Sequence, residues 1–61
     1  MKMWIARDSG ITADLYLYEN KPYLNDGFWD ADGQFYNIDI DLFPEVTFEN
    51  SPMEVELVLK K

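Results

Sequence analysis

The chain contains no cysteine and no histidine among its 61 residues. Disulfide bridges are therefore excluded, and so are the common zinc sites and the thiol or imidazole groups that most often perform acid–base and nucleophilic catalysis. The two serines, Ser9 and Ser51, stand in predicted turns, where a hydroxyl usually bonds the local backbone. We therefore expect a protein that is not an enzyme and that needs no cofactor.

Positive charge is also scarce. Five Lys and Arg residues stand against twelve Asp and Glu residues, so that the net charge is −7. This balance disfavours binding to nucleic acid or to an anionic membrane and favours an encounter with a basic protein. The chain has no run of 18 apolar residues, and residues 1–7 are too short for the apolar part of a signal peptide, so we expect a cytoplasmic protein.

The length allows one domain, and we expect residues 1–61 to form a single small β domain. Four Phe, four Tyr and two Trp supply buried area in place of disulfides and metals. No segment keeps an apolar period of 3.6 over ten residues, whereas several alternate with a period of two. The sequence therefore predicts an all-β fold.

The clearest strand signal is the alternation of apolar and mostly charged residues over 53–60. Residues 36–42 show the same period, and we expect these two strands to pair. Their polar side chains would then share one acidic face, made of Asp39, Asp41, Glu54 and Glu56.

Three further strands are predicted at residues 2–7, 11–18 and 28–30. A tight turn at Asp8-Ser9-Gly10 joins the first two, and Asp32-Gly33 is the strongest hairpin signal, leading into a strand over 34–42. Residues 23–27 are predicted to be a loop, and residues 42–46 a short helical turn. The result is a single antiparallel sheet of about five strands, either a meander or a small barrel like those of SH3 and OB folds.

Three runs resemble short hypothetical proteins of gut bacteria, some of which belong to prophages or other mobile elements. The runs are Trp4–Asp8 (WIARD), Leu15–Pro22 (LYLYENKP) and Asp41–Pro52 (DLFPEVTFENSP). In those proteins the first turn lies close before the second run, whereas here residues 11–14 intervene, which implies a longer or irregular first hairpin. The resemblance implies a small accessory protein, such as a phage-encoded inhibitor, acting on a larger partner; it implies no activity and no site residues.

The acidic face, together with the aromatic residues Trp29, Tyr16 and Tyr18, is the candidate surface for a larger and basic protein partner. Other interpretations stay open. The carboxylates can form a solvated outer face, and the aromatics can belong to the core. Trp29 and the tyrosines can instead stack on a carbohydrate or small molecule, and exposed sheet edges can support a homo-oligomer.

Asp26, Asp30 and Asp32 form an oxygen-rich stretch with two glycines, which makes them weak candidates for a calcium site. The spacing lacks the alternating ligands and the final Glu of an EF-hand. Turns are rich in Asp and Gly for conformational reasons alone, so no metal is expected.

Overall fold

Six β-strands in two antiparallel sheets make up the fold in a computed structural model, which describes residues 1–58. The all-β prediction is confirmed. The strands are β1 (Lys2–Arg7), β2 (Leu15–Tyr18), β3 (Tyr23–Asn25), β4 (Phe28–Asp30), β5 (Phe35–Ile38) and β6 (Met53–Glu56). The main sheet has the order β5-β2-β1-β6, and β3 and β4 form a separate two-stranded sheet.

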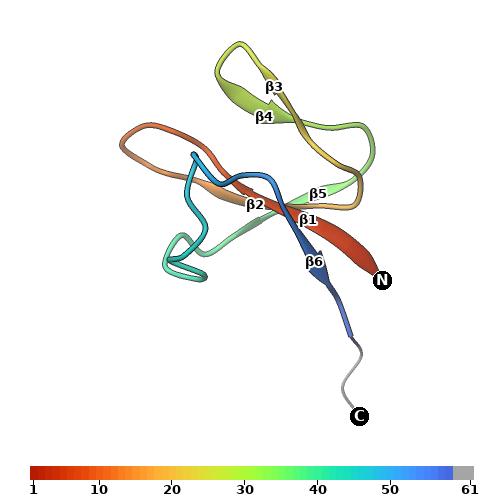
Figure 1. Cartoon of the computed structure of the whole chain (residues 1–61). Helices are drawn as coiled ribbons and strands as arrows, with labels where there is room; N and C mark the ends of the chain where they lie inside the picture. Colours follow the sequence, from red (N-terminus) through yellow and green to blue (C-terminus); the bar gives the residue numbers. More distant parts are fainter. Residues whose placement is uncertain (59–61) are drawn as a thin grey trace.

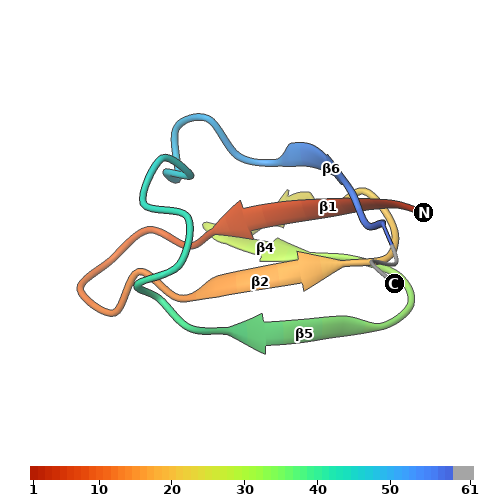
Figure 2. The ribbon, with the colours of Figure 1, turned by 90° about the horizontal axis from the view of Figure 1, so that it is seen from below.

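The main sheet is covered differently on its two faces. The β3–β4 hairpin lies over one face, and much of the connection between β5 and β6 lies below the other (Figure 1). Seen from below, the four strands run side by side with the hairpin behind them (Figure 2). This arrangement leaves β5 and β6 at the two opposite edges of the sheet.

The strand register separates the side chains of the main sheet into two sets. Ile5 lies opposite Leu17 on β2 and opposite Met53 on β6, so these three side chains share one face. We call it the Ile5 face. Trp4 lies opposite Tyr18 on the other face, which we call the Trp4 face.

The hydrophobic core lies on the Ile5 face. Ile5, Leu15 and Val46 are buried there, and Leu17, Ile38 and Val55 pack against them half-buried. Val46 comes from the connection between β5 and β6, so this connection supplies the cover for the centre of the sheet.

The predicted pairing of residues 36–42 with 53–60 is wrong. β6 pairs with β1, and β5 pairs with β2. Alternation identifies which face of a strand is buried but not which strand lies next to it, and the long connection carries the chain from one edge of the sheet to the other. Residues 59 and 60 of the predicted last strand lie outside the described residues.

β5 ends at Ile38 because the chain turns immediately afterwards. The Asp39 carboxylate accepts a hydrogen bond from the Asp41 N–H, and the Asp39 carbonyl accepts one from the Leu42 N–H. The predicted helical turn at 42–46 is a β-turn instead, in which the Val46 N–H donates to the Phe43 carbonyl.

Two predictions about the region of the β3–β4 hairpin are wrong. Residues 23–27, predicted as a loop, form β3 and a two-residue turn at Asp26-Gly27, where φ is 54° and 85°. Positive φ at both positions is typical of a type I′ turn, which matches the twist of a hairpin. Asp32-Gly33 does not join paired strands, because β4 pairs with β3 and β5 with β2.

The first connection is a loop rather than a tight turn. β2 begins at Leu15, and the loop is closed by a hydrogen bond of 2.8 Å from the Asp8 N–H to the Asp14 carbonyl. The predicted Asp8-Ser9-Gly10 turn and the strand over 11–14 are therefore wrong. Ile11 is fully exposed in this loop.

The Arg7 guanidinium joins two connections to the end of β1. It donates to five backbone carbonyls at 2.6–3.2 Å, those of Ala13, Ile40, Leu42, Phe43 and Val46. Ala13 belongs to the first loop and the other four to the connection between β5 and β6. A single side chain therefore fixes the segment that covers the Ile5 face.

Candidate functional site

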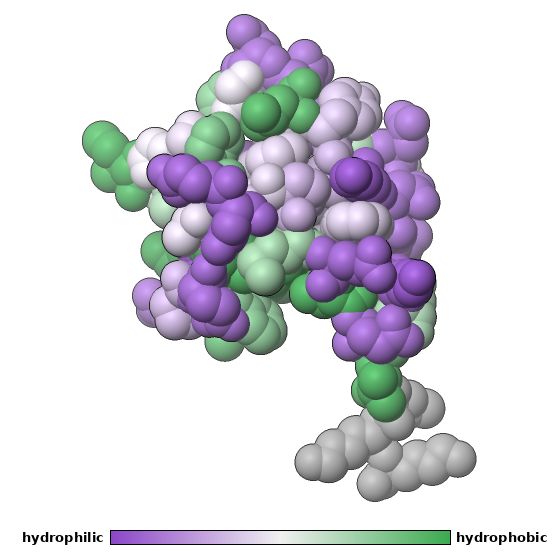
Figure 3. Space-filling view, in the orientation of Figure 1, coloured by the Kyte–Doolittle hydropathy of each residue, from purple (hydrophilic) through white to green (hydrophobic). Residues whose placement is uncertain are grey.

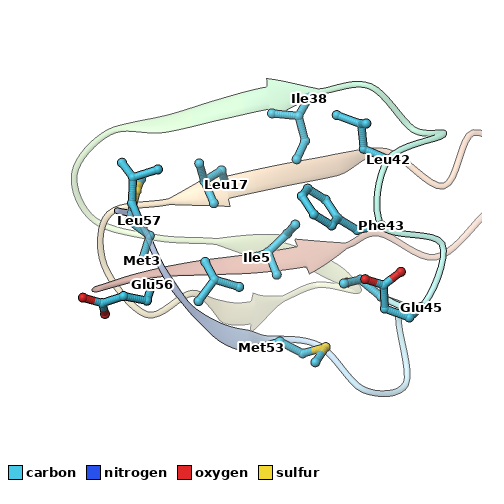
Figure 4. A pocket seen from close by; sticks show the side chains of 12 residues that line it. Met3, Ile5, Leu17, Ile38, Leu42, Phe43, Glu45, Met53, Glu56 and Leu57 are labelled. Carbon is cyan, nitrogen blue, oxygen red and sulfur yellow. The ribbon is translucent and has the colours of Figure 1, made fainter. Parts of the chain in front are cut away.

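An apolar groove runs across the Ile5 face where the cover is incomplete. Its volume is about 450 Å³. The strands supply the floor, and the connection between β5 and β6 and the chain after β6 supply the sides (Figure 4). The residues lining this apolar groove are Met3, Ile5, Leu17, Ile38, Leu42, Phe43, Glu45, Val46, Met53, Val55, Glu56 and Leu57.

The sides of the apolar groove expose large hydrophobic side chains to solvent. Leu42, Phe43 and Leu57 are each about half exposed. Apolar side chains (green) reach the surface on the lower side of the molecule, next to hydrophilic ones (purple), in Figure 3. A well-formed apolar groove is the default candidate for a binding site.

The polar residues of the apolar groove are both carboxylates. Glu45 and Glu56 lie at opposite ends of it (Figure 4). The Glu56 carboxylate accepts a hydrogen bond of 3.1 Å from the N-terminal ammonium of Met1, and both groups are more than half exposed. With a net charge of −7 on the chain, the potential around the groove attracts cations.

The acidic face predicted from the sequence does not form. Glu54 and Glu56 lie on β6 at one edge of the sheet, and Asp39 and Asp41 lie in the turn after β5 at the other edge. Two strands separate the pairs because β5 and β6 are not neighbours. Glu54 lies 3.6 Å from the Lys2 ammonium in an exposed ion pair.

The three aromatic residues predicted to bind a partner are buried or half-buried and pack within the fold. Tyr18 is 2% exposed, so it has almost no surface for a partner. Tyr16 is half-buried, and its ring centroid lies 6.1 Å from that of Tyr18 and 5.9 Å from that of Phe35. Trp29 is half-buried and donates its indole N–H to the Arg7 carbonyl at 3.1 Å.

Two tyrosines have raised pKa values for different reasons. Burial raises the pKa of Tyr18, and the negative charge of Asp8 adds to this effect. The pKa of Tyr36 is raised because its hydroxyl donates a hydrogen bond of 3.1 Å to the Glu19 carboxylate, which stabilises the neutral phenol.

The free energy of unfolding is therefore expected to fall at alkaline pH. Below pH ~10 a tyrosine is neutral in both states, and above it the unfolded chain loses the proton first. The folded state then binds more protons, so stability decreases with pH, by at most ~1.4 kcal/mol per pH unit for the buried Tyr18. Urea unfolding at several alkaline pH values checks this, and Tyr18→Phe should flatten the decline; equal slopes for the two proteins would contradict it.

The calcium candidates are not gathered into a site. The Asp30 carboxylate accepts hydrogen bonds from the Ala31 N–H and the Asn25 side-chain amide, and Asp26 is in the type I′ turn. Across residues 1–58, no group of three or more acidic side chains could hold a metal ion.

Comparisons of the chain with protein-family models, with curated proteins and with solved structures gave no match. Within the described part of the chain, no helix is long and apolar enough to cross a membrane.

Proposed function

We propose that this protein is a non-enzymatic interaction module that binds a larger, basic protein through the apolar groove. The observation that carries the proposal is the groove itself, an unfilled apolar surface across the Ile5 face. Glu45 lies at one end of it, and Glu56, whose side chain is on the opposite face of β6, lies beside the other end. Apolar burial supplies affinity in such a site, whereas charge speeds the encounter and selects the partner.

The resemblance to proteins of prophages and mobile elements supports an accessory or inhibitory role in the cytoplasm. The net charge of −7 favours a basic target. This site replaces the four-carboxylate face expected from the sequence, while the class of partner is unchanged.

Leu42→Glu is expected to reduce partner binding at least tenfold, because it places a charge in apolar surface that binding would desolvate. The matched control is Leu24→Glu on β3. The two leucines are 49% and 53% exposed, but Leu24 does not line the groove. Both variants should keep the fold, which circular dichroism checks.

The measurement is affinity capture from bacterial lysate at ~0.15 M and ~1 M salt, followed by mass spectrometry. The Debye length falls from ~8 to ~3 Å over this range. A basic protein that is retained by the wild type and by Leu24→Glu, and lost with Leu42→Glu and at high salt, supports the proposal. Equal retention by Leu42→Glu, or retention of acidic proteins alone, overturns it.

A further inference from the structure

Within residues 1–58, the outer edge of β6 has backbone groups that pair with no other strand. The Leu57 N–H donates to the Met1 carbonyl at 2.8 Å, which sets the phase of the β1–β6 ladder. Hydrogen-bonded pairs alternate along an antiparallel ladder, so Val55 also bonds to β1, while the N–H and C=O groups of Glu54 and Glu56 point away from the sheet.

The side chains on either side of this edge differ sharply. On the Ile5 face, Met53, Val55 and Leu57 line the apolar groove. On the opposite face are Glu54 and Glu56, whose side chains are 47% and 59% exposed. A strand laid along β6 would thus place alternate side chains beside apolar surface and beside carboxylates.

We propose that the partner binds by strand addition at β6: it supplies an extended segment in which apolar residues alternate with Lys or Arg. This inference rests on the proposed function and specifies how the partner is recognised. Main-chain hydrogen bonds to Glu54 and Glu56 supply part of the affinity, and the two sets of alternating side chains supply specificity. The apolar side chains of the partner strand pack beside Val55 at the groove. Its Lys or Arg side chains form ion pairs with Glu54 and Glu56.

A second copy of the chain does not fit this edge. Antiparallel pairing of two β6 strands centred on Val55 would set Glu54 of one copy directly opposite Glu56 of the other. Like charges in that position destabilise a sheet, and each copy carries a net charge of −7. The other free edge, β5, has the sequence Phe-Tyr-Asn-Ile and so offers no carboxylate to a basic strand.

The test uses a synthetic peptide of about six residues in which Lys and Val alternate, together with the intact protein. Amide hydrogen exchange is followed by NMR. In the free protein, the Glu54 and Glu56 amides should exchange quickly and the Val55 amide slowly. At saturating peptide, exchange at Glu54 and Glu56 is expected to slow at least tenfold, with no comparable change at Phe35 and Asn37 on β5.

Two comparisons sharpen this result. A peptide N-methylated at the amides that would face β6 should bind at least tenfold more weakly. Glu54→Gln/Glu56→Gln should weaken binding about threefold to tenfold, and more than the control Asp32→Asn/Glu49→Gln. The control removes the same charge from two exposed side chains that lie outside β6.

The outcomes separate the inference from the function on which it rests. Binding that shifts Leu42 and Phe43 in the groove without protecting Glu54 and Glu56 overturns strand addition and leaves the proposed function standing. Protection along β5 instead of β6 also overturns it. If neither this peptide nor a basic amphipathic helical peptide binds, both the inference and the proposed function fail.

Discussion

Replacement of Arg7 by Ala is expected to leave the chain largely unfolded. The guanidinium donates to five carbonyls of two connections, and it is half-buried at the end of β1. Hydrogen bonds from a charged donor contribute ~1.5–3 kcal/mol each, and the loss of several shared ones is not additive. A loss of ~3 kcal/mol or more approaches the total of 3–5 kcal/mol that a core of this size usually supplies.

Arg7→Lys separates the charge from the geometry. Lysine keeps the positive charge but has three donors on one atom, whereas the planar guanidinium has five in a fixed fork. We expect Arg7→Lys to be intermediate in stability in urea unfolding followed by Trp fluorescence. The control is Lys2→Ala, which removes an exposed ion pair with Glu54 and should change stability by less than ~1 kcal/mol. If Arg7→Lys were as stable as the wild type, the carbonyls would not depend on the guanidinium.

The fold class and two strands could be predicted from the sequence because they depend on local signals. Residues 2–7 and 28–30 form strands with the predicted bounds. Alternation was sufficient for residues 2–7, and flanking turn residues were sufficient for the three residues at 28–30. The neighbours of β5 and β6 could not be predicted, because the two strands have similar alternation, and alternation shows which face of a strand is buried but not which strand lies next to it.

The two Asp-Gly pairs show why local signals fail to place hairpins. Asp26-Gly27 makes the two-residue turn, whereas Asp32-Gly33 belongs to the link between the two sheets. In both pairs the glycine has positive φ, at 85° and 90°. Whether an Asp-Gly pair joins two paired strands depends on the segments that flank it. The three residues at 23–25 are too few to show the period of two that would identify a strand.

The candidate site was predictable only in part, for a related reason. The carboxylates Glu54 and Glu56 were predicted as binding residues and lie at the free edge beside the groove, although their binding role is a proposal. Leu42 and Phe43 were assigned to a helical turn instead. Their exposure depends on Arg7, 35 positions or more away in sequence, which holds their carbonyls and so directs the connection over the Ile5 face. The alternation of apolar and polar residues along a sequence gives no information on a hydrogen bond between a side chain and a distant backbone carbonyl.

Trp29→Ala is expected to release the β3–β4 hairpin from the main sheet while the sheet stays folded. Trp29 holds the hairpin by three contacts, of which the substitution removes two: the indole N–H to the Arg7 carbonyl and the ring against Phe48 at 6.0 Å. The backbone N–H, which donates to the Asp8 carboxylate at 3.2 Å, remains. A two-stranded hairpin has little stability by itself in water. Amide exchange should therefore accelerate by at least a hundredfold at Phe28 in β4, whose N–H lies in the hydrogen-bonded pair that closes the two-residue turn, and by much less in β1 and β2.

Trp29→Phe tests which of these contacts matters most. It keeps an aromatic ring against Phe48 and removes only the indole donor, so we expect a loss of ~1 kcal/mol in hairpin protection compared with ~3 kcal/mol for Trp29→Ala. Phe28→Ala is the matched control, because Phe28 is the neighbouring aromatic residue of β4 and is 62% exposed. Its hairpin should remain docked. Unchanged exchange in Trp29→Ala would show that the links at 19–22 and 31–34 are enough to hold the hairpin, and that Trp29 is free for the ligand-stacking role considered from the sequence.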